Sequence, residues 1–276
     1  MVDIGGRNLR AVRAGPEDTQ PLIVCEHGAF GCAADWTVVQ DRLAALGLRS
    51  LAYDRAGLGY SDPGPAPRDG REINHDCDAL LAALGEAGPL LLMGHSMGGL
   101  MVRLFALTRP ERVVGLVLVD AMTPDILDIP GGRRAIMGFG RLLQVAGVAG
   151  RFGLMAPVAQ FSSGFIGLTG AAAVEKRRIH GSASHAQGAA AEVLSWPATS
   201  ALAGASELPT DLPLAVVTAG AYHPANPVKL AQVRPAERSR HGWLEHVAGA
   251  THASVLGPRH ADAIIRGVQH VLVTGG

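Results

Sequence analysis

"PLLLMGHSMGGLMVRLFALT", residues 89–108, joins an apolar run to a helical pattern through the pentapeptide Gly94-His95-Ser96-Met97-Gly98. The apolar run is typical of a buried strand, and the residues after it repeat apolar side chains at three- and four-residue spacing. A G-x-S-x-G pentapeptide in this setting puts serine on a sharp strand-to-helix turn, with its hydroxyl exposed at the end of a sheet. Ser96 is therefore a candidate nucleophile. The alternative is a glycine-rich turn in which the serine has no chemical role.

Short apolar runs alternate with helical patterns over most of the chain. Further strands are expected in "PLIVCEHG", "LRSLAYDRAG", "VVGLVLVDA", "LPLAVVTAG" and "WLEHVAGATH". Helices are expected over residues 36–46, 72–86, 98–108 and 259–272. Runs that are apolar on both faces are typical of parallel strands covered by helices. The sequence therefore predicts an α/β protein with a mostly parallel central sheet flanked by helices.

The composition narrows the classes of partner. Lys plus Arg equals Asp plus Glu, at 24 each, so we expect no nucleic acid or other polyanion to bind. The three cysteines, Cys25, Cys32 and Cys77, show neither metal-ligand nor disulfide spacing. The N-terminus has no apolar stretch of the secretory type, and no apolar run approaches the ~18 residues of a membrane span. We therefore expect reduced cysteines and a cytoplasmic protein.

Residues 124–207 break the alternation, because the pattern predicts no strand there. Four of the six phenylalanines fall in this segment: Phe139, Phe152, Phe161 and Phe165. No acidic residue occurs between Asp128 and Glu175, but four arginines do: Arg133, Arg134, Arg141 and Arg151. We predict a helical cap or lid over residues 124–207, with the core formed by residues 1–123 and 208–276. Ordinary extra core, a loosely packed insertion and a basic membrane-binding surface remain alternatives. The sparse arginines argue against membrane association.

Five motifs follow one another in the order that the α/β-hydrolase fold superfamily shows. They are "EHGAFGCAADW", "YDRAGLGYSD", "GHSMGG", "GLVLVDAMTPD" and "GATHASVL". The chain resembles that superfamily over nearly its whole length outside 124–207, and most closely its lid-bearing, esterase-like branch. The resemblance implies a helical cap inserted after strand 6 of the fold. Epoxide hydrolases and haloalkane dehalogenases of this fold have aspartate at the position of Ser96, so the serine argues against those two chemistries.

A serine nucleophile needs a base, and the resemblance implies His252 in "GATHAS". Its position shortly after the last predicted strand agrees. We expect His95 to point away from the site, and His27 to belong to the turn after the first strand. For the oxyanion, the resemblance implies the backbone N–H of Met97 and a second donor from Ala29 or Phe30, with Ala29 favoured.

The acid is missing from its usual place. Most members of the superfamily carry it in a G-x-x-D turn after strand seven, where this chain has Gly220-Ala221-Tyr222-His223. A histidine cannot offset the charge of an imidazolium as a carboxylate does. Asp120 ends the strand "GLVLVD", and some relatives of the fold place their acid there. Ends of neighbouring parallel strands lie about 4.8 Å apart, so this carboxylate can reach the histidine. Glu26 and Asp125 are second choices, and Asp120 could instead only cap its loop.

Two other charged groups have structural interpretations. We expect Glu26 to act as a hydrogen-bonding prop for the loops of the site, and Asp54 and Arg55 to brace the loops around Ser96.

Together these residues predict a serine hydrolase that cleaves small-molecule carboxylic esters, with an apolar acyl or alcohol group, through an acyl-enzyme. Ser96, His252 and Asp120 form the expected triad, and neither cofactor nor metal is implied. Lactone hydrolysis, perhydrolysis and cleavage of carbon–carbon bonds need the same triad and remain alternatives. A non-catalytic ligand receptor on this fold is the alternative from another class. The natural substrate and the oligomeric state stay open.

Overall fold

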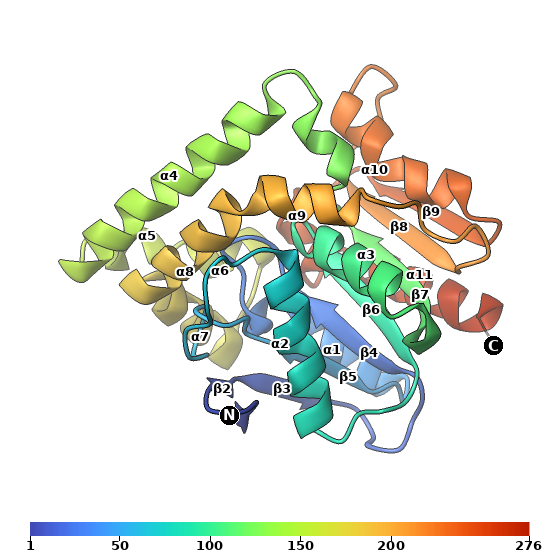
Figure 1. The fold of residues 1–276 in the computed structure, drawn as a ribbon, viewed down its shortest axis with the longest axis horizontal. Coiled ribbons are helices and arrows are strands. Elements are labelled where there is room, and N and C mark those ends of the chain that lie inside the picture. The colour runs from blue at the N-terminus through green and yellow to red at the C-terminus, as the bar shows by residue number, and fades with distance from the viewer. Residues whose placement is uncertain (276) are drawn as a thin grey trace.

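The computed structural model describes residues 1–275. Within them, seven strands form one central sheet in the order β3-β5-β4-β6-β7-β8-β9 (Figure 1). Their bounds are β3 (Ala11–Ala14), β4 (Leu22–Glu26), β5 (Ser50–Tyr53), β6 (Leu90–His95), β7 (Val113–Val119), β8 (Leu214–Ala219) and β9 (Gly242–Val247). Strands β4 to β9 are parallel, and β3 is antiparallel to β5. The prediction of an α/β protein with a mostly parallel central sheet is confirmed.

Helices cover both faces of the sheet. One face packs against α1 (Thr37–Ala45) and α11 (Ala261–Thr274). The other packs against α2 (Gly70–Ala83), α3 (Gly98–Thr108) and α10 (Pro227–Arg238). Strands covered on both sides in this way are mostly apolar, and every residue of β6 and β8 is buried. All four helices expected from spacing are present within three residues of their predicted ends, whereas α10, which contains Pro235, was not predicted.

Side-chain caps fix where two of these helices begin. The carboxylate of Asp69 accepts hydrogen bonds from the backbone amides of Arg71 and Glu72 at the start of α2. Asn226 does the same for α10, accepting from the amides of Val228 and Lys229. Such caps satisfy amides that have no partner inside the helix, so the chain turns into helix at these residues.

The N-terminal strands were not predicted. Strands β1 (Val2–Asp3) and β2 (Asn8–Leu9) form a small antiparallel pair, and β3 lies at the edge of the main sheet. All three have at most four residues, and β3 is only partly buried. Strands this short carry too little alternation of apolar and polar residues to be identified by period.

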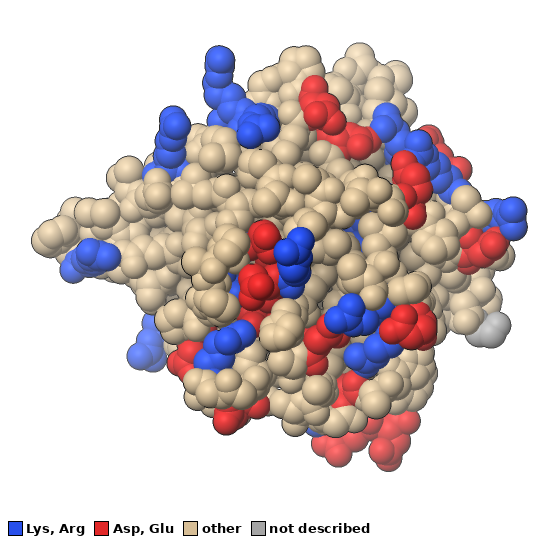
Figure 2. Space-filling view, viewed as in Figure 1, with Lys and Arg blue, Asp and Glu red and all other residues tan. Residues whose placement is uncertain are grey.

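Residues 124–207 are helical, and within the described chain no strand occurs there. The longer helices are α4 (Gly132–Arg151), α7 (Gly170–His180), α8 (Ala183–Leu194) and α9 (Trp196–Ala203), and the short ones are α5 (Ala156–Ala159) and α6 (Ser162–Ile166). We call this stretch the helical segment. It follows β7 in the chain. Helix α4 projects beyond the sheet, and that end of the molecule is mostly uncharged in the view of Figure 2. The division into core and cap domains stays a prediction.

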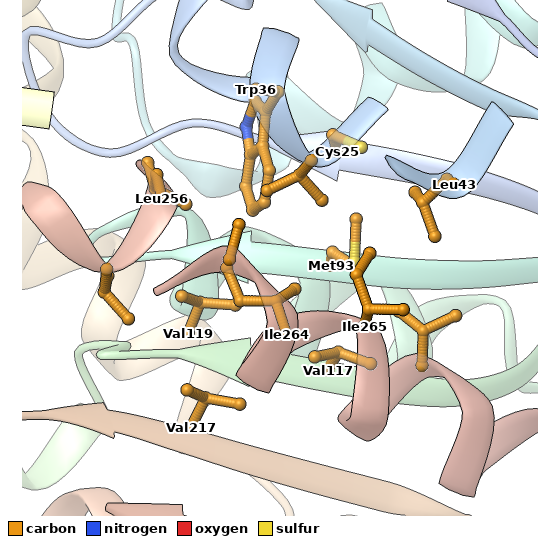
Figure 3. Close-up of a cluster of buried hydrophobic side chains, with 14 of the residues drawn as sticks. Cys25, Trp36, Leu43, Met93, Val117, Val119, Val217, Leu256, Ile264 and Ile265 are labelled. Carbon is orange, nitrogen blue, oxygen red and sulfur yellow. The ribbon is translucent and has the colours of Figure 1, made fainter. Parts of the chain in front are cut away.

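The core between the sheet and α11 is built from branched apolar side chains. Val117, Val119 and Val217 from the strands face Ile264 and Ile265 of α11 (Figure 3). Each of these five side chains is at least 93% buried, and burying one contributes about 1.5–3 kcal/mol to stability. The three cysteines are also buried, and none of them forms a disulfide within residues 1–275. This packing fixes the strand ends, where the candidate residues lie.

Candidate active site

Ser96 lies at the turn between β6 and α3, in a backbone conformation that ordinary residues avoid. Its φ is +54°, and the residue is 93% buried. A side chain at Gly98 would meet the carbonyl oxygen of Glu26 at 2.3 Å, and one at Gly28 would meet the Cβ of Ser96 at 2.9 Å. The glycines are therefore required by close approach of the neighbouring loop, as the pentapeptide predicts.

The structure brings Asp120 and His252 together. The Nδ1 atom of His252 lies 2.6 Å from Oδ2 of Asp120. Asp120 follows β7, and the backbone amide of Ser96 donates to the carbonyl of Val119 on that strand, at 3.2 Å. The other candidate acids lie elsewhere: Glu26 binds Arg55, and Asp125 pairs with Arg234 at the surface.

His223, at the usual position of the acid, is exposed. Its Nδ1 accepts a hydrogen bond from the amide of Ala225, two residues further on, at 3.2 Å. This contact only shapes the loop between β8 and α10. The carboxylate next to His252 therefore comes from strand β7.

Lys229 holds the second oxygen of the Asp120 carboxylate. Its Nζ donates to Oδ1 at 2.8 Å, and the amide of Ala219 donates to the same oxygen at 3.0 Å. Burial alone would raise the pKa of Asp120, but hydrogen bonds from His252 and Lys229 outweigh it and hold that pKa well below its ordinary value. The carboxylate is therefore ionised at neutral pH.

Sequence reasoning missed Lys229, although a signal was available. The chain has two lysines, Lys176 and Lys229, against 22 arginines. Both lysines pair with a buried aspartate, Lys176 with Asp35 and Lys229 with Asp120. A lysine is a compact point charge on a flexible stem, suited to a narrow site where a planar guanidinium does not fit. Because lysine is so rare in this arginine-rich chain, Lys176 and Lys229 could have been identified from the sequence as candidates for a specific role.

The expectation for His95 was wrong. Its ring lies 4.7 Å from the ring of His252, and its Nε2 is 2.8 Å from the backbone carbonyl of His252. Burial lowers the pKa of His95 to about 3, with the neighbouring His252 as the next cause. His95 is thus neutral, and its Nε2–H donates to that carbonyl. It holds the backbone of the histidine loop instead of pointing away.

The loop after β4 is held from beneath by Arg55, which is 1% exposed. The guanidinium donates to the carbonyls of His27, at 2.6 Å, and Gly28, at 3.0 Å. It also binds Glu26 and, through two hydrogen bonds, Glu192 of α8. With its carbonyls engaged in this way, the loop is fixed. The structure agrees with the interpretation of Glu26 and Arg55 as props.

Asp54 braces the neighbouring turns. Its carboxylate accepts from the amides of Ala33, at 2.7 Å, and Tyr60, at 3.0 Å. Nothing in this arrangement suggests a metal site at "DRAGLGYSD", and within residues 1–275 no group of three or more His, Cys, Asp or Glu is arranged to hold an ion.

The amides predicted to receive an oxyanion remain candidates for that role. In the described part of the chain, the amides of Ala29, Phe30 and Met97 donate to no other backbone carbonyl. Phe30 has a φ of +57°, and Met97 precedes the first turn of α3, where helix amides point outward. The choice between Ala29 and Phe30 stays a prediction.

His185 of α8 supports the same loop. Its Nδ1 accepts from the amide of Gly59 at 3.0 Å, so its Nε2 carries the proton and donates to the carbonyl of Phe30 at 3.3 Å. Burial lowers the pKa of His185 to about 3. Sequence reasoning did not single out this residue, because nothing in its own helix marks it.

Ser96 and His252 line one cavity of about 210 Å³ between the sheet and the helical segment. Ala29 and Phe30 line it as well, so four of the six predicted site residues share it. Its apolar lining includes Phe139, Phe165, Ile166 and Leu256, and its polar lining includes Asp35, Lys176 and His180. The site is thus a cavity with an apolar wall, one buried ion pair and the Ser96–His252–Asp120 group.

A family model described as alpha/beta hydrolase fold matches residues 21–140. An sn-1-specific diacylglycerol lipase of Mus musculus is 37% identical over 103 residues, which are 37% of this chain and 33% of the lipase. This chain's matches span 18% to 40% of the length of four curated relatives.

Solved structures resemble the chain over almost its whole length. A putative epoxide hydrolase from Pseudomonas aeruginosa superposes with a TM-score of 0.78 at 15% identity, over 100% of this chain and 97% of that one. An esterase from Thermogutta terrifontis superposes with a TM-score of 0.66 at 20% identity, over 96% and 94%. At such identities the likeness shows the fold. With the sheet order and the strand-to-helix turn at Ser96, these matches show that the chain has the α/β-hydrolase fold.

Proposed function

We propose that the protein is a serine hydrolase of carboxylic esters. The observation that carries the proposal is the Ser96–His252–Asp120 group: a strained serine, a histidine in the same cavity, and a carboxylate 2.6 Å from that histidine. Serine at this turn is activated by a general base, and a carboxylate on the far nitrogen orients that base. The aligned relative named as a diacylglycerol lipase supports an ester as substrate.

The mechanism follows from the positions of these groups. The Oγ of Ser96 attacks the acyl carbon while Nε2 of His252 takes its proton, and the N–H groups of Met97 and of Ala29 or Phe30 receive the oxyanion. His252 returns the proton to the departing alcohol. Water, deprotonated by His252, then attacks the acyl-enzyme and releases the acid with Ser96 restored.

Asp120 serves this sequence by holding Nδ1–H of His252. The depressed pKa of Asp120 keeps it ionised, so it stabilises the imidazolium that forms in each half-reaction. Lys229 and the amide of Ala219 occupy the other carboxylate oxygen and fix the plane of the carboxylate. A histidine at position 223 could not supply the negative charge that stabilises the imidazolium. In this proposal Asp120 therefore takes the place of the usual acid.

The cavity lining favours an apolar substrate group. Phe139, Phe165 and Ile166 come from the helical segment, and Leu256 from the loop after His252. Apolar walls with few polar groups are typical of pockets for small apolar ligands. We therefore propose an ester with an apolar acyl or alcohol group, with residues 124–207 as a cap over it.

The test is the initial rate on p-nitrophenyl esters from acetate to decanoate, with Ser96→Ala as the blank. A fluorophosphonate probe should label the wild type and not Ser96→Ala. Ser162→Ala is a matched control, since this buried serine lines the same cavity but donates to a backbone carbonyl. Labelling without ester turnover would redirect the search to lactones and carbon–carbon substrates. No labelling at all would overturn the proposal in favour of a ligand receptor.

A further inference from the structure

The outer side of helices α4 to α6 presents apolar side chains to solvent. Six of them are 55% to 76% exposed: Leu142, Val145, Val148, Phe152, Phe161 and Phe165. We call these six the exposed apolar face. A folded protein rarely exposes several large apolar groups on adjoining helices unless something covers them.

The opposite side of α4 is already used. Gly140, Leu143 and Gly147 are its buried residues. A Cβ at Gly147 would lie 2.7 Å from Cγ of Gln187, and one at Gly150 would lie 2.9 Å from the Cα of Ala183. Helix α4 is therefore packed closely on α8. The exposed apolar face is what remains for a partner outside the chain.

The charges carried by residues 129–174, which include this face, all have one sign. Arg133, Arg134, Arg141 and Arg151 are exposed, and the sequence has no Asp or Glu from 129 to 174. Figure 2 shows basic side chains standing on this otherwise uncharged end, while acidic and basic groups are intermixed over the rest of the visible face. An apolar face set among arginines is complementary to a surface that is apolar inside and anionic outside.

We infer that the exposed apolar face docks the protein onto an anionic lipid surface, with α4 lying in the plane of that surface. A second copy of the chain fits less well. A two-fold dimer would place this face against itself, with arginines opposing arginines and no carboxylate from residues 129–174 between them.

A crossing of the bilayer also fits less well. No single helix within residues 1–275 is long and apolar enough to span a membrane, although the bent pair Gly132–Arg151 and Ala156–Ile166 passes that test jointly. The pair is bent by 113° at the break between its two parts, and α4 is packed on α8. A helix apolar on its outer side and bound to protein on its inner side lies on a membrane.

The cavity opens at the same place. Phe165 is 67% exposed and Phe139 is 38% exposed, and both also line the cavity that holds Ser96. Docking would put the mouth of the cavity at the lipid surface, so an apolar ester could enter without crossing water. This second step rests on the proposed function, whereas the docking does not.

The experiment is sedimentation of the full chain with phosphatidylcholine vesicles, with and without phosphatidylserine, at low and high salt. The wild type should bind the anionic vesicles, and salt should weaken binding. The double variant Val145→Asp/Phe152→Asp should abolish it. Arg141→Gln/Arg151→Gln should weaken binding about 25-fold, from about a fivefold loss for each arginine near an anionic surface. Leu46→Asp/Val273→Asp, exposed apolar residues outside the helical segment, should bind as the wild type does.

Three outcomes would overturn the inference. The wild type could stay in solution with every vesicle, or Val145→Asp/Phe152→Asp could bind normally. The wild type could also form a dimer in analytical ultracentrifugation that this variant abolishes, which would assign the face to a second copy.

Hydrolysis of soluble p-nitrophenyl butyrate should be unchanged in the variant Val145→Asp/Phe152→Asp. Vesicle binding without any ester turnover would support the docking and reject the proposed function. Ester turnover without vesicle binding would support the proposed function and reject the docking.

Discussion

The carboxylate of Asp120 divides its two oxygens between His252 and Lys229. Asp120→Asn should lower kcat on a p-nitrophenyl ester by up to about 10⁴-fold, because an amide neither stabilises the imidazolium nor selects the right tautomer. Asp125→Asn is the matched control, since this carboxylate follows the same strand but pairs with an arginine at the surface. A kcat of Asp120→Asn within tenfold of the wild type would exclude Asp120 as the acid. Circular dichroism would check that the variant is folded.

His185 makes stability depend on pH. Burial lowers its pKa to about 3 in the folded chain, whereas an unfolded histidine titrates near 6.5. Between about pH 6.5 and 3 the unfolded chain binds a proton that the folded chain does not. The free energy of unfolding should therefore fall as pH falls through this window, by up to about 1.4 kcal/mol per pH unit from this residue. Urea denaturation of the wild type and of His185→Gln, at pH 7.5 and 5, measures the difference.

In His185→Gln, the free energy of unfolding should fall less steeply between pH 7.5 and 5, by up to about 1.4 kcal/mol per pH unit. Equal slopes in the two proteins would show that His185 is not held neutral. His95, whose pKa burial also lowers to about 3, remains in both proteins and cancels from the comparison.

The sequence could indicate site residues that lie close to a strand end, and it missed those that lie on helices. Ser96, Asp120 and His252 each follow a strand of one parallel sheet, so chain order already brings them to one edge. Lys229 and His185 come from α10 and α8, whose directions relative to the strands no local pattern encodes. His95 was misjudged because its ring direction depends on the loop of His252, 157 residues away.

At the scale of elements, glycines decide how closely α4 approaches α8. Gly138→Ala should raise the free energy of unfolding by up to about 1 kcal/mol, since alanine favours helix and nothing lies within 4 Å of the new Cβ. Gly150→Ala should lower it by about 1–3 kcal/mol, because its Cβ would meet the backbone of Ala183 at 2.9 Å. Thermal or urea denaturation compares the two. Stabilisation by both substitutions would contradict the close packing of α4 on α8.

Long or fully buried elements were predictable, and very short or partly exposed ones were not. Strands β4 to β8 are buried and helix α3 is long enough for its apolar spacing to show, and each falls where the sequence places it. Strands β1 and β2 have two residues each, β3 is as short as β5 but only partly buried, and the proline inside α10 hid a helix that Asn226 caps. The order of the strands in the sheet follows from long-range packing, and no local pattern contains it.

At the scale of the whole molecule, Arg55 joins the helical segment to the sheet. Burial raises the pKa of Glu26, and the two carboxylates on Arg55 come from β4 and from α8. Glu192→Gln should lower the free energy of unfolding by about 3–5 kcal/mol, the usual loss when one partner of a buried ion pair is removed. Glu207 pairs with Arg238 at the surface, where its side chain is 68% exposed. Glu207→Gln should therefore change the free energy of unfolding by less than about 1 kcal/mol. Equal effects in urea denaturation would show that the Arg55 pair does not join the two parts.

Composition and charge balance described the molecule only on average. The net charge of zero conceals a segment of 46 residues, 129 to 174, in which every charged side chain is an arginine. From sequence, that segment's arginines were too sparse to indicate a membrane. Their meaning changes once α4 turns its apolar residues outward, and that orientation depends on the fit between α4 and α8.

Both lysines of the chain are shielded, with side chains only 6% and 11% exposed. Reagents that acylate amines should therefore leave Lys176 and Lys229 unmodified while the helices stay in place. Lys176 belongs to α7 and its Nζ is held by Asp35 in the cavity wall, so its acylation requires that pair to separate and the cavity under the helical segment to admit the reagent. The rate at which a dye couples to Lys176 would then time the opening of the helical segment, with Lys229 as an internal standard on the other side of the site.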